Sequence, residues 1–253
     1  MQDRSETEAN DRTAAIIRSN WQRVRDQVAD ACAKAGRETS DVTIVGVSKY
    51  VSPELAAQLI EAGCKHLGEN RPQHLWAAAE FYRTKSDQPN ADQPAVAWHM
   101  IGHLQRNKIA RTIPIIRLLH SLDSLRLAQA LSLESKTLEL TLPVLVEVNV
   151  TEDGAKTGLP ATQLTSFFDQ VAGLPHLRIQ GLMAMSSLAA DSSAIQREFE
   201  QVRLLRDQIQ RQFVGMCQLN ELSMGMSGDY REAIAQGATI VRIGSLLWEG
   251  ILN

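Results

Sequence analysis

Eight short β-rich runs alternate with helical patterns along most of this chain, and this alternation restricts its fold more than any other feature. Several runs are apolar at consecutive positions, as at Val144-Leu145-Val146, which is typical of strands that helices cover on both faces of a parallel sheet. Eight strand–helix units predict an α/β protein with a single (β/α)8 TIM barrel rather than an open doubly wound sheet. The runs are Val42–Lys49, His66–Asn70, Ala97–Gly102, Leu118–Asp123, Pro143–Val150, Arg178–Met185, Gln218–Met224 and Thr239–Gly244.

The segment before the first run has the spacing of an extra N-terminal helix. Apolar side chains between Thr13 and Gly36 fall on one stripe, and Gly36 is expected to cap the C-terminus of the helix. Residues 1–12 are expected to form a poorly ordered tail. Barrels of this kind commonly contain about 250 residues, so the 253 residues predict one barrel domain over positions 1–253.

The composition excludes several classes of protein. There are 26 Lys and Arg residues against 29 Asp and Glu residues, and a net charge of −3 provides no basic surface for nucleic acid. The first ten residues are too polar for a signal peptide, and no apolar run approaches the length of a membrane span. The cysteines, an odd number and far apart, predict reduced thiols in a cytoplasmic protein; they are Cys32, Cys64 and Cys217.

The residues that end each strand matter most, because barrels build their functional sites at the carboxyl ends of the strands. The first run ends in Ser48-Lys49. A lysine at the end of a doubly covered strand is expected to point into the barrel mouth, where desolvation would lower its pKa and leave more neutral amine to attack an aldehyde. The alternative is a lysine that extends from the strand end into solvent.

The last two strand–helix turns are built from small residues. Ser227 and Gly228 follow the seventh run, and Gly244 and Ser245 lie at the end of the eighth. Backbone N–H groups are exposed in such turns, and barrels commonly bind a phosphate after strands seven and eight. The alternative is two ordinary turns that use glycine for its backbone freedom.

Arg242 precedes Gly244 by two positions, so strand alternation puts both on one face with Arg242 deeper in the barrel. A guanidinium at that depth needs a partner, either a carboxylate of the fold or a heteroatom of a ligand. An amine that attacks aldehydes, a phosphate site and a deep arginine together fit pyridoxal 5′-phosphate (PLP), with its ring nitrogen against Arg242.

These residues belong to motifs that resemble the pyridoxal phosphate homeostasis protein family, whose barrel is that of the alanine racemase N-terminal domain. The resemblance extends from about Thr43 to Gly250. The motifs are Val47-Ser48-Lys49, Gly68-Glu69-Asn70, Trp98-His99-Met100-Ile101-Gly102, Leu104-Gln105-Arg106-Asn107-Lys108, Gly181-Leu182-Met183-Ala184, Leu222-Ser223-Met224-Gly225-Met226-Ser227 and Val241-Arg242-Ile243-Gly244.

The resemblance implies a role for each matching position. Lys49 matches the lysine that forms a Schiff base with PLP, and Arg242 matches the arginine that faces the pyridine nitrogen. Asn70 resembles a position that lines the cofactor pocket. Phosphate contacts are implied for Ser227, Gly244 and Ser245, the last two mainly through backbone N–H groups. No metal ligand and no catalytic residue is implied.

Four further positions are notable, but no contact with PLP is assigned to them. His103 stands where the family usually has proline and Arg71 where tyrosine is frequent, so an altered pocket rim is expected. Lys156 resembles a family residue near the site, and the alternative is a charged residue in a solvated turn. His99 is expected to be a hydrogen-bonded histidine near the barrel mouth rather than a metal ligand with His103, because Gly102 argues against a helix there.

The resemblance implies a cytoplasmic monomer that holds PLP on Lys49 and buffers it or delivers it to PLP-dependent apo-enzymes. Related racemases take a second base from another domain, and this chain ends at Asn253 soon after the last run, so no turnover is expected. One alternative is a racemase or lyase of small amino acids that uses Lys49 alone as its base. Another is a barrel aldolase or isomerase that acts on a sugar phosphate without a cofactor.

Overall fold

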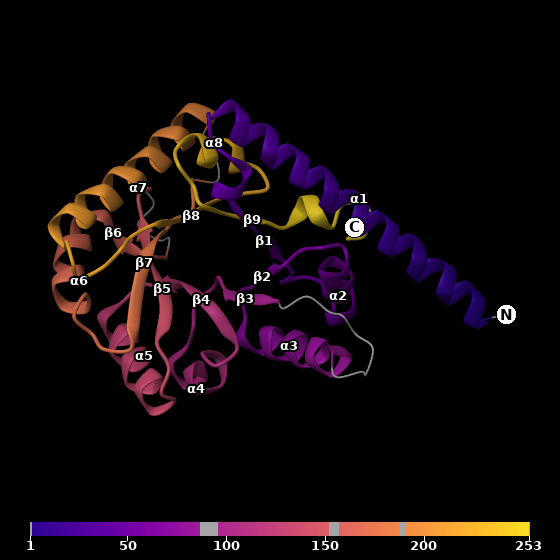
Figure 1. Cartoon of the computed structure of the whole chain (residues 1–253), viewed down its shortest axis with the longest axis horizontal. Helices are drawn as coiled ribbons and strands as arrows, with labels where there is room; N and C mark the ends of the chain where they lie inside the picture. Colours follow the sequence, from indigo (N-terminus) through magenta and orange to yellow (C-terminus); the bar gives the residue numbers. More distant parts are fainter. Residues whose placement is uncertain (1, 87–95, 152–156, 188–190, 253) are drawn as a thin grey trace.

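The computed structural model describes residues 2–86, 96–151, 157–187 and 191–252. Within these residues the main sheet is a closed barrel of eight parallel strands in the order β4-β3-β2-β1-β9-β8-β7-β5, and the pairing of β4 with β5 closes the circle (Figure 1). Each predicted run overlaps one strand, and the bounds differ by at most three residues, so the (β/α)8 TIM barrel is confirmed. The strands are β1 (Thr43–Val47), β2 (His66–Glu69), β3 (Ala97–Met100), β4 (Ile116–Leu122), β5 (Leu142–Asn149), β7 (Leu177–Met183), β8 (Glu221–Met226) and β9 (Ile240–Ile243).

Helices follow the strands and surround the barrel (Figure 1). A two-residue strand, β6 (Leu159–Pro160), pairs with the end of β5 and was not predicted. In the described residues no helix has both the length and the apolar character needed to cross a membrane. The α-helices are α1 (Gln2–Lys34), α2 (Pro53–Glu61), α3 (Pro72–Ser86), α4 (Ile109–Thr112), α5 (Leu125–Thr137), α6 (Leu164–Val171), α7 (Ser192–Gln212) and α8 (Tyr230–Ala235), and the 3-10 helices are η1 (Thr39–Asp41), η2 (Arg106–Lys108), η3 (Ala161–Gln163) and η4 (Ser245–Leu247).

Helix α1 is longer than the predicted helix over Thr13–Gly36 and includes nearly all of the segment predicted as a poorly ordered tail. Residues 2–12 contain no glycine or proline, so no helix-breaking residue lies there. Gln58 on α2 donates from Nε2 to Oδ1 of Asn10 at 2.6 Å, which ties this first part of α1 to the barrel. Gly36 has a left-handed φ of +66° just after the helix and confirms the predicted C-terminal cap.

The buried face of α1 packs against α2, α8 and η4. Asn20 on this helix donates from Nδ2 to the backbone carbonyl oxygens of Leu247 and Glu249, at 3.1 and 2.9 Å. These hydrogen bonds satisfy carbonyl groups near the end of the chain and hold the last turn of the barrel against α1. The extra helix therefore supports the segment that follows β9.

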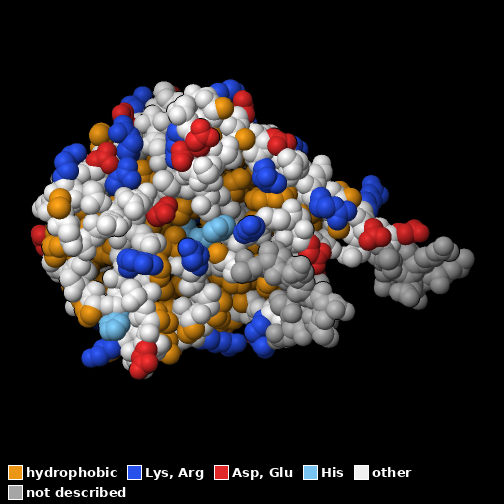
Figure 2. Space-filling view, viewed as in Figure 1, with side chains coloured by type: hydrophobic (Ala, Val, Ile, Leu, Met, Phe, Trp, Pro, Cys, Tyr) orange, Lys and Arg blue, Asp and Glu red, His pale blue; other side chains and the backbone are white. Residues whose placement is uncertain are grey.

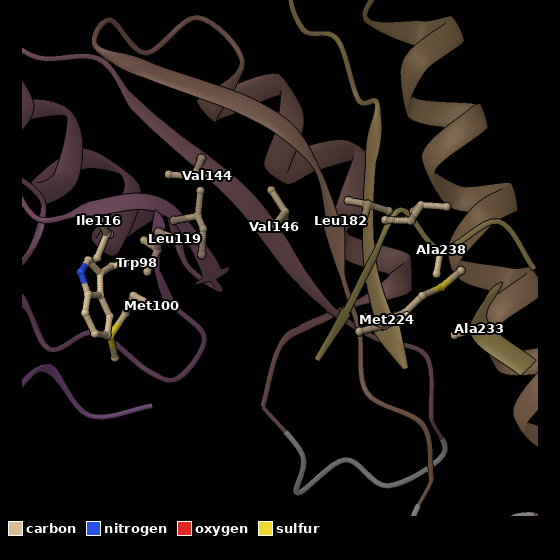
Figure 3. Close-up of a cluster of buried hydrophobic side chains, with 14 of the residues drawn as sticks. Trp98, Met100, Ile116, Leu119, Val144, Val146, Leu182, Met224, Ala233 and Ala238 are labelled. Atoms are coloured by element: carbon tan, nitrogen blue, oxygen red, sulfur yellow. The ribbon is translucent and has the colours of Figure 1, made fainter. Parts of the chain in front are cut away.

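Hydrophobic side chains form one core between the strands and the helices and a second, smaller core inside the barrel. Figure 3 shows members of the outer core, among them Val144 and Val146 of β5 and Leu182 of β7. Leu145 lies between the two valines in sequence and belongs to the inner core with Met183. Successive residues of β5 are therefore buried on opposite faces, which explains its consecutive apolar residues.

Strands β7 and β8 approach each other closely at Gly181, which is paired with Glu221. A Cβ atom added at Gly181 would lie 1.8 Å from the backbone carbonyl oxygen of Glu221. Since that neighbour is backbone rather than a flexible side chain, the sheet itself would have to move.

We therefore expect Gly181→Ala to lower the free energy of unfolding by about 3 kcal/mol, because overpacking against backbone forces the two strands apart. Gly173→Ala is the matched control, since a Cβ there has no neighbour within 4 Å, and it should change stability by less than about 1 kcal/mol. Urea unfolding followed by circular dichroism measures both. Equal stability of the two variants would contradict the close approach of β7 and β8.

Candidate functional site

A cavity of about 860 Å³ lies at the carboxyl ends of the strands, within the usual range for small-molecule sites. Its walls come from the ends of β1, β2, β3, β5, β7, β8 and β9 and the turns that follow them. The structure brings together all of the residues predicted from the sequence as site residues in the wall of this one cavity; they are Lys49, Asn70, Ser227, Arg242, Gly244 and Ser245.

Lys49 lies in a tight turn directly after β1. The backbone N–H of Val51 donates to the carbonyl oxygen of Ser48 at 3.0 Å and closes this turn. Lys49 is half-buried, and its Nζ lies 4.8 Å from the centre of the Tyr50 ring. Tyr50 itself is 73% exposed, so the amine lies at the opening of the cavity beside an accessible aromatic side chain.

A buried carboxylate lies next to this turn. Glu69 at the end of β2 is 2% exposed, and its Oε1 accepts a hydrogen bond of 2.6 Å from the Ser48 hydroxyl. Burial raises the pKa of Glu69, while the Ser48 hydrogen bond acts in the opposite direction. The Gly68-Glu69-Asn70 motif contained this residue, but its contact with Ser48 depends on the pairing of β1 with β2 and was not predicted.

Arg242 in β9 is 4% exposed and is held by neutral acceptors. Its Nη1 donates to the carbonyl oxygen and to Oγ of Ser223, both at 2.7 Å, and its Nη2 donates to the carbonyl oxygen of Ala184 at 2.9 Å. Burial lowers the pKa of the guanidinium to about 10, so the group remains charged at neutral pH. Among the described residues no carboxylate forms an ion pair with Arg242, which leaves N–H groups for a ligand in the cavity that it lines.

The turns after β8 and β9 lie against each other. The backbone N–H of Gly244 donates to Oγ of Ser227 at 3.1 Å, so these two predicted phosphate contacts are neighbours. Asp229 fixes the first turn because its Oδ1 accepts from the backbone N–H of Met226 at 2.5 Å. Trp248 Nε1 donates to the carbonyl oxygen of Val47 at 2.7 Å, which holds the second turn beside the end of β1.

Comparisons with known proteins show which family the chain belongs to. Residues 14–250 match the family model for the alanine racemase N-terminal domain. A pyridoxal phosphate homeostasis protein from Aquifex aeolicus is 35% identical over 226 residues, which cover 89% of this chain and 94% of the relative. The chain belongs to the pyridoxal phosphate homeostasis protein family.

Two solved structures resemble this family member over most of its length. A crystal structure of a Bifidobacterium adolescentis protein has 33% sequence identity and a TM-score of 0.87, over 94% of this chain and 96% of that chain. The structure of PipY from Synechococcus elongatus with PLP bound has 29% identity and a TM-score of 0.74, over 87% of this chain and 99% of that chain.

The departures from the family pattern lie in different places. His103 lines the cavity, and its Nδ1 lies 3.4 Å from Oδ2 of Asp123. This departure from the family pattern therefore lies in the cavity wall. Arg71 is exposed and does not belong to the cavity wall as described. Lys156 lies outside the described residues.

A buried carboxylate in the cavity wall itself was also not predicted. Glu147 in β5 accepts a hydrogen bond of 2.5 Å from the Thr157 hydroxyl, and both residues line the cavity. Burial raises the pKa of Glu147, with the nearby Asp123 adding to the effect and Arg242 opposing it. The signal in the sequence was an acidic residue within an otherwise apolar run, at Val146-Glu147-Val148.

The prediction that His99 is hydrogen-bonded is confirmed, but its predicted place near the barrel mouth is wrong. It hydrogen-bonds to His66 and His120. It lies toward the amino-terminal end of the barrel, where it lines a separate small cavity with His66, and not at the mouth that holds Lys49. β3 begins at Ala97 as predicted, but the partners of the His99 ring are His66 and His120 on the neighbouring strands, which the sequence of β3 alone does not show.

Proposed function

We propose that this protein binds PLP in the cavity at the carboxyl ends of its strands, holds it on Lys49, and so contributes to intracellular PLP homeostasis. The observation that carries the proposal is that one cavity wall combines an amine, a buried arginine that forms no ion pair with a carboxylate among the described residues, and the two adjoining turns of small residues. These groups match the aldehyde, the ring nitrogen and the phosphate of PLP in their chemistry.

In this proposal Lys49 supplies the covalent attachment. Lys49 would hold PLP through a C=N bond from its amine to the aldehyde carbon, and the aldehyde oxygen would be released as water with protons from the amine. The Ser48–Glu69 hydrogen bond fixes the turn that carries Lys49, because Ser48 precedes it directly. The amine thereby stays at the cavity opening.

Arg242 and the last two turns orient the ligand. A guanidinium only donates hydrogen bonds, so Arg242 would bind an unprotonated ring nitrogen, and PLP held in this way withdraws electrons less strongly than PLP paired with a carboxylate. Ser227, Gly244 and Ser245 would bind the phosphate through hydroxyl and backbone N–H groups, and Asn70 would line the ring. Arg242 and the turns lie on adjacent strands, which sets their separation.

The proposed role is storage and delivery of PLP rather than turnover. Tyr50 beside Lys49 is largely exposed, so water reaches the attachment point, and carbanion chemistry is favoured by sites that exclude water. We infer that the protein acts as a cytoplasmic monomer and passes PLP to PLP-dependent apo-enzymes. Its relatives of nearly equal length carry the name homeostasis protein, which favours this role over a racemase or lyase.

The attachment is tested with borohydride, which reduces the C=N bond and makes it permanent. We expect purified protein with PLP to be yellow and reduction followed by peptide mapping to place PLP on Lys49. Lys49→Ala should lose the reducible adduct and bind PLP at least about tenfold more weakly, since phosphate and ring contacts remain. Lys65→Ala, an exposed lysine just before β2 at the other end of the barrel, is the matched control. A colourless wild-type protein without a fixed adduct would contradict the proposal.

Exchange of the α-proton separates storage from turnover. We expect the PLP-loaded protein in D₂O to exchange the α-protons of alanine, serine and other small amino acids within about tenfold of the rate with free PLP. Proton NMR measures the exchange, with free PLP at the same concentration as the control. Turnover at an enzyme-like rate of about 1 s⁻¹ or faster would instead establish the racemase or lyase alternative.

A further inference from the structure

A continuous line of hydrogen-bonded side chains crosses the interior of the barrel and ends at Arg242. Nδ1 of His66 lies 3.0 Å from Nε2 of His99, and Nδ1 of His99 lies 2.9 Å from Nε2 of His120. Nδ1 of His120 lies 2.8 Å from Oγ of Ser223, the atom to which Arg242 donates at 2.7 Å. The line therefore joins β2, β3, β4, β8 and β9.

The environment of the line keeps its imidazoles neutral. His99, His120 and Ser223 are buried, and burial lowers the pKa of His99 to about 3 and that of His120 well below its ordinary value. His66 is half-buried, and burial also lowers its pKa, with Arg117 and Lys65 acting in the same direction. Each ring therefore has one nitrogen that donates and one that accepts at neutral pH.

The outer end of the line opens into the small cavity at the amino-terminal end of the strands. This cavity of about 200 Å³ is lined by His66 and His99 together with Arg117 and Arg178. Figure 2 shows histidine side chains near the middle of the face viewed, with Lys or Arg side chains close by. His66 is half-buried and Ser223 is fully buried, so the line reaches the surface at His66 and is enclosed at Ser223.

Neutral imidazoles in a line must all point the same way, and Arg242 selects the direction. Because a guanidinium cannot accept a hydrogen bond, Oγ of Ser223 is the acceptor in its contact with Arg242, and the Ser223 hydroxyl hydrogen is free for Nδ1 of His120. Nε2–H of His120 then donates to His99, and Nε2–H of His99 donates to His66. In the opposite direction Oγ of Ser223 would accept from both neighbours, and no contact in the described residues takes its hydrogen.

We propose that His120, His99 and His66 are positioning residues for Arg242: they hold the Ser223 hydroxyl as an acceptor and so fix the guanidinium at the angle at which it meets the ligand. The proposal rests on the proposed function, because that function assigns Arg242 to the ring nitrogen of PLP. Glu147 and Asp229 also face Arg242 electrostatically, but neither supplies a hydrogen bond that would set its angle.

The direction of the line is tested on the protein without PLP. We expect ¹⁵N chemical shifts of the imidazoles to show neutral rings for His99 and His120 between pH 5.5 and 8, with the proton on Nε2 in both. A proton on Nδ1 of His120 would overturn the proposal, whether or not the protein binds PLP. This measurement also separates the two claims, since failure of the wild-type protein to bind PLP defeats the proposed function alone.

The effect on Arg242 is tested with two substitutions of one residue. His120→Leu removes the acceptor for Ser223, and we expect PLP binding about tenfold weaker and a shift in the pH titration of the bound-PLP absorbance band. His120→Asn keeps an acceptor near the position of Nδ1 and should restore affinity to within about twofold of wild type. Ser132→Ala, which removes a buried hydroxyl that donates to Pro175, is the matched control and should leave both readouts unchanged.

Thermal unfolding of each variant without PLP shows whether it is folded. If His120→Asn is folded and binds PLP as weakly as His120→Leu, or if both bind like the wild type with an unchanged pH titration, the histidines only pack the barrel and the proposal is wrong. If His120→Leu does not fold, the comparison of His120→Asn with wild type and the tautomer measurement still decide it.

Discussion

The hydrogen-bonded pairing of the first strand with the last is the constraint on which the site depends. Val45 pairs with Arg242 and Gly46 pairs with Ile243, in parallel, so the residues that follow both strands emerge at the same end of the barrel. The amine and the small-residue turns, almost two hundred positions apart in sequence, become neighbours for this reason. The Trp248 hydrogen bond to Val47 and the packing of α1 against η4 reinforce the same junction.

The second requirement is a charged group inside a closed barrel. A buried guanidinium is costly to desolvate unless its N–H groups are satisfied, and the neutral oxygens of Ser223 and Ala184 satisfy part of that need without neutralising the charge. A carboxylate partner would use the same N–H groups and cancel the charge. The buried guanidinium of Arg242 therefore keeps its positive charge. The histidine line that begins at Ser223 provides further hydrogen bonds inside the barrel and, because its imidazoles are neutral, adds no charge.

Much of this could be predicted from the sequence, because strand ends are visible as the points where apolar runs meet small or charged residues. Lys49 and Gly244 were placed in one site by that rule and by family likeness. Contacts that depend on how neighbouring strands pair could not be predicted, so the buried Glu69 was missed and His99 was assigned to the wrong end of the barrel. Glu147 was also missed, because its partner Thr157 lies beyond the end of the strand that contains it. The early start of α1 was missed because helix-forming polar residues carry no hydrophobic period.

The central claim is that one cavity, formed where β1 and β9 meet, holds the aldehyde and the phosphate of PLP at once. A crystal structure of the protein grown with PLP tests it most directly. The account predicts continuous electron density from the Lys49 side chain into the ligand, with its phosphate against Ser227 and Ser245 and its ring nitrogen against Arg242. Ordered PLP bound anywhere else, with this cavity containing only water, would contradict it.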